Sequence, residues 1–208
     1  FSLVKVLRGG KPNGINYPYY WRRAVLGAIA SRALGEAVGQ TLLEELFLAG
    51  LLQDIGVLAL DRSRPETYRG IGDIQKDHRE LQAHERRVLG TDHAEVGAWL
   101  LKTWNLAPRL YNAVEQSHRA AMQRVIEPGE VFNRCLALSG PIADIFLLDT
   151  EHRPFVETAQ AVERSLDLNK EGFGKVLATV GALLPESEKL FDTEVRGATD
   201  PDLIIEQA

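Results

Sequence analysis

The sequence predicts an all-α fold, and three observations support that prediction. Apolar residues recur every three to four positions through most of the chain, which is the spacing of one face of a helix. No segment shows a convincing alternation of apolar and polar residues, the pattern of half-buried strands. Segments with proline and glycine separate the periodic stretches. The chain is therefore expected to fold as a series of helices, without an internal repeat.

The first two helices are predicted from residues typical of helix starts. Pro18 precedes a long helix with one apolar face. Thr41 is predicted to cap the second helix, with Glu44 three residues on as in a capping box. That second helix leads directly into Gln53 and Asp54, where an acid stands inside an apolar stretch.

The middle of the chain alternates between polar and apolar segments. Residues 61–75 are polar and predict a loop or a short helix. Residues 76–89 are highly charged and predict an exposed helix that ends at Gly90. Asp92 is predicted to start the next helix, which runs to Trp104.

The remaining helices follow from proline placement and apolar content. Pro108 suits the first turn of a helix that runs to about His118. A strongly apolar helix is predicted over residues 130–148, with Pro141 kinking or dividing it. Residues 149–208 predict two or three further helices.

Composition limits the function classes. The chain has 208 residues, a net charge of −5 and no basic run, so we expect no nucleic-acid partner. No apolar run approaches the roughly 20 residues of a membrane-spanning helix, so no membrane association is expected. Cys135 is the one cysteine, which fits a reducing compartment and predicts a cytoplasmic location. The chain begins at Phe1, and we expect it to be a piece of a longer protein.

Four potential ligand residues lie at helix positions expected to face the core: Asp54, His93, His118 and Asp144. Two imidazoles and two carboxylates could hold Zn, Mn or Fe. Spacing alone does not separate that reading from hydrogen-bonded core histidines and capping aspartates. Both interpretations therefore stay open on the residues themselves.

Four stretches together carry a resemblance to a known family: residues 47–56, 89–101, 104–108 and 113–118. On these stretches the chain resembles the HDOD domain family, a degenerate branch of the HD-domain phosphohydrolase superfamily. The resemblance implies an HD-domain-like helical bundle over residues 17–148. It also implies that residues 1–16 are a remnant of the family's N-terminal helical part. Residues 149–208 would then be a C-terminal helical extension leading to a linker.

The resemblance also predicts a dismantled metal site. Active HD enzymes hold metal with a first His, an adjacent His-Asp pair and a distant Asp. By this likeness Trp21 takes the first His position, Gln53 replaces the second His, and Asp54 and Asp144 match the two acids. Glutamine offers only a weak carbonyl oxygen in place of an imidazole nitrogen.

Two further histidines, His93 and His118, resemble those of the HD-GYP cyclic-dinucleotide phosphodiesterases. That branch has a Lys where this chain has Val57, and a Glu where it has Arg119. We therefore expect no catalytic residue, no bound metal and no cofactor. Six positions are interpreted as vestigial: Trp21, Gln53, Asp54, His93, His118 and Asp144.

Several side chains have simpler expected roles. Trp21 is expected to be a core aromatic, and Gln53 a hydrogen-bonded polar group among the helices. Two further tryptophans are expected to pack, although an exposed one could anchor a partner: Trp99 and Trp104. Three histidines lie in polar segments and are expected to face solvent: His78, His84 and His152.

The resemblance favours a non-catalytic bacterial signalling module. Its partner would be a protein, a fused output domain such as a GGDEF diguanylate cyclase of cyclic di-GMP signalling, or a second copy in a homodimer. The alternative is a metal-dependent HD-type phosphohydrolase whose ligands are Asp54, His93, His118 and Asp144. A third reading is a ligand sensor that uses the emptied pocket.

Overall fold

The computed structural model describes residues 14–72, 77–118 and 130–191, and within these ranges every regular element is a helix. The prediction of an all-α fold is confirmed. The predicted N-terminal remnant up to residue 13, Arg119 and the end of the predicted extension from residue 192 lie outside the described residues. No helix in the described ranges has the length and hydrophobicity to cross a membrane. The elements are α2 (Tyr17–Ala37), α3 (Leu43–Leu52), α4 (Ile55–Ser63), α5 (Pro65–Tyr68), α6 (His78–Leu89), α7 (His93–Thr103), α8 (Pro108–Gln116), α9 (Glu130–Leu147), the short 3₁₀ helix η3 (Thr150–His152), α10 (Phe155–Leu166) and α11 (Lys170–Phe191).

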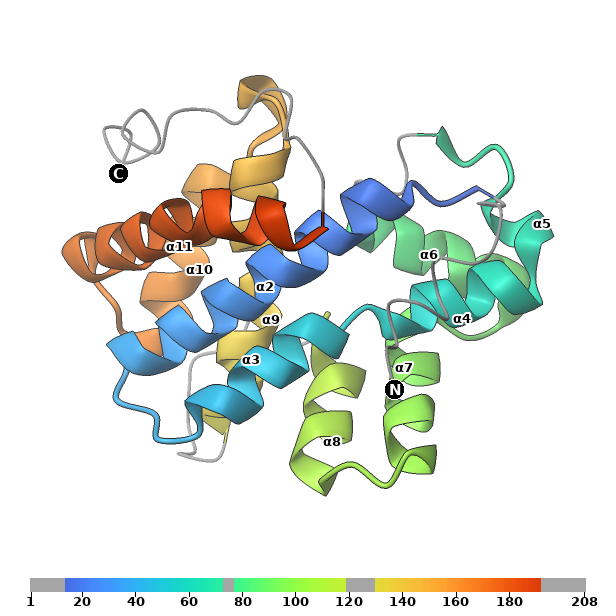
Figure 1. The fold of residues 1–208 in the computed structure, drawn as a ribbon, viewed down its shortest axis with the longest axis horizontal. Coiled ribbons are helices and arrows are strands. Elements are labelled where there is room, and N and C mark those ends of the chain that lie inside the picture. Colours follow the sequence, from blue (N-terminus) through green and yellow to red (C-terminus); the bar gives the residue numbers. More distant parts are fainter. Residues whose placement is uncertain (1–13, 73–76, 119–129, 192–208) are drawn as a thin grey trace.

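Helix α2 runs through the middle of the molecule, with α3, α9 and α11 packed around it (Figure 1). It starts where the Asn16 side chain accepts a hydrogen bond from the Tyr19 amide at 3.1 Å. From Ala24 to Ala30 every residue is buried, so α2 is enclosed on all sides rather than along one stripe. A polar side chain on this part of α2 must therefore find its partners inside the protein.

The main core is shared between the early and late helices. Leu26 and Leu34 of α2 are buried in one cluster with side chains from α10 and α11. These late contributors are all apolar: Val162, Phe173, Val176, Leu177, Val180 and Leu184. The helices α10 and α11, which follow residue 149, are therefore part of the main core. A second, smaller cluster lies around α4 and α5 and includes Leu58 and Tyr68.

The predicted helix leading into Gln53 and Asp54 is in fact two helices. Helix α3 ends at Leu52, and α4 starts at Ile55 after a two-residue turn. Residues 61–75 were predicted as a loop or a short helix, and the short helix α5 lies there, after α4 continues to Ser63. The prediction of a Thr41 cap is wrong. Helix α3 starts at Leu43, and no side chain caps its first turn.

Other predicted termini are confirmed. Gly90 follows α6 with a φ of +74°, a conformation that glycine adopts without strain. Asp92 caps α7 and accepts a hydrogen bond from the Glu95 amide at 3.0 Å. Pro141 lies within α9, which continues past it, so the proline does not divide this helix.

Helices α4 and α7 approach each other closely at Gly56. A Cβ atom at Gly56 would overlap the carbonyl oxygen of His93 and lie 2.8 Å from the Gly97 amide nitrogen. Both obstacles are backbone atoms, which cannot rotate away. The absence of a side chain here lets the start of α4, next to Asp54, lie against the start of α7.

We predict that Gly56→Ala lowers the free energy of unfolding by roughly 2–3 kcal/mol, because the added methyl group forces α4 and α7 apart. Gly174→Ala is the matched control, since a Cβ at Gly174 meets no atom of the described residues within 4 Å. Alanine there should raise stability by roughly 0.5–1 kcal/mol through its helix propensity. Urea denaturation followed by circular dichroism measures both. Equal effects of the two substitutions would contradict the close approach.

Candidate functional site

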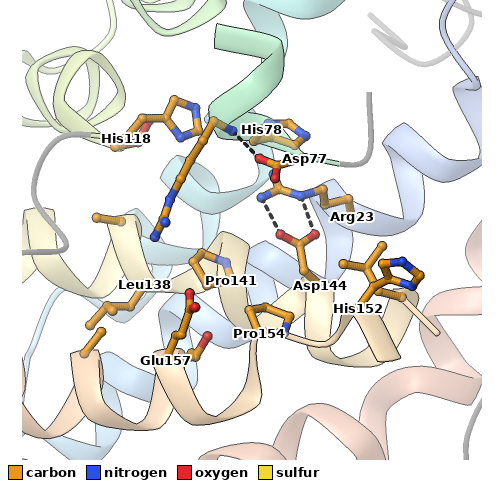
Figure 2. A pocket seen from close by; sticks show the side chains of 16 residues that line it. Arg23, Asp77, His78, His118, Leu138, Pro141, Asp144, His152, Pro154 and Glu157 are labelled. Atoms are coloured by element: carbon orange, nitrogen blue, oxygen red, sulfur yellow. Dashed lines mark hydrogen bonds and ion pairs between the residues drawn. The ribbon is translucent and has the colours of Figure 1, made fainter. Parts of the chain in front are cut away.

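A buried guanidinium joins two carboxylates at the centre of the molecule. Arg23 of α2 is 3% exposed, and its Nη1 lies 2.5 Å from Oδ2 of Asp54. Its Nε donates to Oδ1 of Asp144 at 2.8 Å, and its Nη2 donates to Oδ2 of Asp144 at 3.2 Å. Figure 2 shows this two-pronged bond to Asp144. Arg23 thus links α2 to the turn before α4 and to α9.

Neighbouring charges favour the ionised forms of Arg23 and Asp54. Burial opposes the charge of Arg23, but Asp144 and Asp54 outweigh it and raise the pKa of Arg23 further. Burial also opposes the charge of Asp54. The positive charges of His78, when protonated, and of Arg23 outweigh it and hold the pKa of Asp54 well below its usual range. Arg23 and Asp54 therefore remain ionised inside the protein.

The second oxygen of Asp54 faces three imidazoles. Its Oδ1 lies 3.5 Å from Nδ1 of His78, 3.6 Å from Nε2 of His118 and 3.8 Å from Nε2 of His93. The two Nε2 atoms of His93 and His118 are 2.7 Å apart. We call these four residues, Asp54, His78, His93 and His118, the imidazole cage. Their ligand-capable atoms all lie within 4.8 Å of one another.

The imidazole cage is assembled from helix ends. His78 is the first residue of α6, His93 is the first residue of α7, and His118 follows the end of α8. Asp54 lies in the turn between α3 and α4. Four segments distant in sequence thus each contribute one side chain to the same point.

A buried carboxylate fixes the orientation of His93. Glu85 is fully buried, and its Oε2 lies 2.6 Å from Nδ1 of His93 and accepts from the His93 amide at 2.8 Å. The hydroxyl of Tyr68 donates to the other Glu85 oxygen. Because Nδ1 of His93 faces Glu85, its Nε2 faces the imidazole cage. Carboxylates orient metal-binding histidines in this way.

The three imidazoles differ in their affinity for protons. Burial lowers the pKa of His118 to about 4, and burial and Arg23 lower the pKa of His78. Burial opposes the charge of His93 too, but the hydrogen bond to Glu85 and its charge raise the pKa of His93. At neutral pH, His78 and His118 therefore keep a lone pair on a ring nitrogen.

A cavity of about 230 Å³ adjoins the site (Figure 2). His78 and His118 line both the cavity and the imidazole cage, and Arg23 and Asp144 lie on its wall. The rest of the lining comes from α9, α10 and the segment between them and includes Glu157. A small polar molecule in this cavity would lie beside the imidazoles of His78 and His118.

The structure brings four of the six predicted vestigial positions together. Asp54, His93 and His118 meet in the imidazole cage, and Arg23 connects Asp144 to Asp54. Trp21 and Gln53 stand apart from them.

Trp21 and Gln53 pack in other directions. Trp21 is partly buried against the smaller core cluster, with its ring edge-on to Tyr20 at 5.1 Å. Gln53 is buried toward Gly27 of α2, and its amide nitrogen has no hydrogen-bond partner in the described ranges. The expectation of a satisfied Gln53 amide is therefore wrong for that nitrogen.

Three residues of the site were not predicted. Arg23 belongs to a helix predicted to have one apolar face, but α2 is buried all round at that level. His78 was expected to face solvent, which is wrong, because its side chain is only 10% exposed. Glu85 belongs to a helix predicted to be exposed, yet it is fully buried. The unbroken apolar run after Arg23 is the sequence feature that could have indicated its burial, because it leaves no polar side on this part of α2.

The remaining expectations have mixed outcomes. His152 is exposed as predicted, whereas His84 is partly buried, with its Nε2 3.0 Å from the carbonyl oxygen of Thr67. Two tryptophans were expected to pack, with exposure as the alternative, and the structure shows the alternative. Trp99 is 64% exposed and Trp104 is 45% exposed.

The position between Asp54 and Asp144 is where the resemblance places a metal ion. The guanidinium of Arg23 lies there and bonds to both acids. These residues therefore do not fit a metal between the two acids.

Comparisons with known proteins agree with this fold. The HDOD domain family matches residues 1–120. An uncharacterized protein from Treponema pallidum is 29% identical over 101 residues, which are 47% of this chain and 20% of that protein. This chain thus matches a fifth of the length of that relative.

Two solved structures share the arrangement of helices. A candidate phosphohydrolase from Shewanella amazonensis has a TM-score of 0.66 at 22% identity, over 90% of this chain and 68% of that one. The response regulator MmoQ from Methylococcus capsulatus has a TM-score of 0.61 at 28% identity, over 81% of this chain and 64% of that one.

We predict that Arg23→Met lowers the free energy of unfolding by about 3–5 kcal/mol, because it leaves two buried carboxylates without a cation. Arg32→Met, on the same helix, is the matched control. Its ion pair with Glu44 is exposed to solvent, so the expected loss is under about 1 kcal/mol. Urea denaturation measures both variants, and similar losses would show that the buried bridge does not hold the fold.

Proposed function

Because this chain belongs to the HDOD domain family, we propose that it is a non-catalytic regulatory module. It receives a signal and passes it to an attached or partner output domain. The observation that carries this proposal is the bond of Arg23 to both Asp54 and Asp144.

A metal ion at an HD centre would do two things that a guanidinium cannot. It would offer open coordination positions to a substrate phosphate, and it would lower the pKa of a bound water. Arg23 provides positive charge, but three of its N–H groups already donate to Asp54 and Asp144. The chemistry that remains is structural, since Arg23 ties three segments into one unit.

The output domain that we propose is a GGDEF diguanylate cyclase, which would place the module in cyclic di-GMP signalling. Support for this part comes from the resemblance to HDOD regions that precede such domains. The similarity to MmoQ, which is named as a response regulator, is in keeping with a regulatory role. Transmission requires two arrangements of the helices that the signal populates differently.

A second candidate function is a metal-dependent phosphohydrolase with an altered ligand set. The observation that favours it is the imidazole cage beside a cavity of about 230 Å³. Its ligands would be Asp54, His93 and His118 as expected from the sequence, with His78 in place of Asp144. A metal there could activate a water molecule toward a phosphodiester in the cavity.

Turnover separates the two functions. We predict that the protein, supplied with Mn²⁺, Fe²⁺ or Zn²⁺, hydrolyses bis(p-nitrophenyl) phosphate and cyclic di-GMP no faster than its His118→Gln variant. Glu157→Gln is the control, because Glu157 lines the cavity outside the imidazole cage. Circular dichroism confirms that each variant is folded. Metal-dependent hydrolysis that His118→Gln abolishes and Glu157→Gln retains would favour the phosphohydrolase.

A further inference from the structure

We propose that the imidazole cage binds one divalent transition-metal ion, through Oδ1 of Asp54, Nδ1 of His78 and the Nε2 atoms of His93 and His118. This site is distinct from the position between Asp54 and Asp144, which Arg23 occupies. The proposal goes beyond the regulatory role and does not require the protein to be an enzyme.

The spacing of the four atoms is close to that of a ligand shell. A tetrahedral ion with bonds of 2.0–2.1 Å separates its ligands by about 3.3 Å. The distances from Asp54 Oδ1 to the three imidazoles are 3.5, 3.6 and 3.8 Å. The pair His93–His118 is closer, at 2.7 Å. The two separations from His78 to the other imidazoles are within 4.8 Å. Side-chain rotations that move His93 and His118 apart and His78 inward would bring the four atoms to the tetrahedral spacing.

Unsatisfied atoms point into the same space. Oδ1 of Asp54 and Nδ1 of His78 are buried and have no hydrogen-bond partner in the described ranges. Such groups are rare in folded proteins and call for a specific explanation. A single ion would satisfy both atoms at once.

The contact between His93 and His118 supports the same conclusion. Two ring nitrogens 2.7 Å apart cannot both present lone pairs, so a proton or a cation must lie between or beside them. A proton would satisfy these two nitrogens only. It would leave Oδ1 of Asp54 and Nδ1 of His78 as they are.

Charge also favours a divalent ion. The buried groups bonded to one another or to the imidazole cage comprise one guanidinium, that of Arg23, and three carboxylates: Asp54, Asp144 and Glu85. A ring nitrogen that binds a metal carries no proton, so the imidazoles count as neutral in the metal-bound form and the protein groups carry a formal charge of −2. Uncompensated charge inside a protein is costly, and one divalent ion would neutralise it.

The residues around the imidazole cage include a carboxylate that orients a histidine, as is common around metal-binding histidines. Glu85 orients His93, and Tyr68 in turn donates to Glu85. Losing such a partner typically weakens metal binding by 10- to 100-fold. Three imidazoles and one carboxylate suit Zn²⁺, Fe²⁺ or Co²⁺, whereas Mg²⁺ and Ca²⁺ prefer sites made of oxygen atoms.

The test is made on the whole chain, produced without a polyhistidine tag and purified without chelators. We expect elemental analysis to find about one equivalent of a transition metal per chain. After chelator treatment, added Co²⁺ should give the visible absorption of a low-coordinate nitrogen and oxygen site. Added Zn²⁺ should raise the melting temperature.

Two variants test the assigned ligands. His78→Ala should weaken Zn²⁺ binding at least 100-fold, measured by competition with a chelating dye. Glu85→Gln should weaken it by about 10- to 100-fold. His152→Ala is the control, because His152 lines the same cavity outside the imidazole cage and should leave affinity unchanged. Among the described residues Nδ1 of His78 has no hydrogen-bond partner, so its replacement is expected to leave the fold intact.

The outcomes separate this proposal from the proposed function. Less than about a tenth of an equivalent of metal, with no Co²⁺ spectrum, overturns the metal site and leaves the regulatory role standing. Equal Zn²⁺ affinity of the protein and its His78→Ala variant also overturns it. Bound metal without hydrolysis supports both proposals. Bound metal with hydrolysis supports the metal site and overturns the regulatory role.

Discussion

The guanidinium of Arg23 is the interaction on which the rest of the structure depends. It connects Asp54, which is 31 positions away in the chain, to Asp144, which is 121 positions away. Helix α9 leaves room for it at Gly140, where a Cβ would come within 2.5 Å of Nη2 of Arg23. Buried ion pairs seldom add much stability compared with apolar packing, but breaking one is costly. Arg23 therefore favours a single arrangement of α2, α9 and the turn at Asp54.

In that arrangement the two carboxylate oxygens of Asp54 have different partners. One carboxylate oxygen is committed to Arg23, and the other is turned toward the three imidazoles. The imidazole cage thus depends on a bond made outside it. On the other side of the His93 ring, Glu85 holds the orientation of His93, and Tyr68 bonds to Glu85. The site is supported from two sides by groups that do not themselves reach its centre.

Local signals account for what the sequence could predict. Helix periodicity and caps identified most of the helices, including the Asp92 cap and the stop at Gly90. The break between α3 and α4 was missed because apolar residues continue through it. At the site, Asp54, His93 and His118 were identified as potential ligands from their core-facing helix positions, and the family resemblance related them to a metal site.

Arg23, His78 and Glu85 were missed because their burial depends on packing between distant segments. Glu85 shows this best. Its helix is strongly charged, and it is the overlying Tyr68 and the start of α7 that bury it. No pattern along the helix itself records those contacts. Likewise, His78 stands in a polar segment, and only its position at the start of α6 aims it at Asp54.

The packing of α11 against α2 has a mechanical consequence (Figure 1). Three side chains of α11, Phe173, Val176 and Val180, are almost completely buried. Exposing each of these side chains to water would cost about 1.5–3 kcal/mol, so separating α11 from the other helices turn by turn is unfavourable. A force applied at the C-terminal end of α11 is therefore transmitted along this helix to α2. Because Arg23 bonds α2 to Asp144 of α9, the same force also reaches α9.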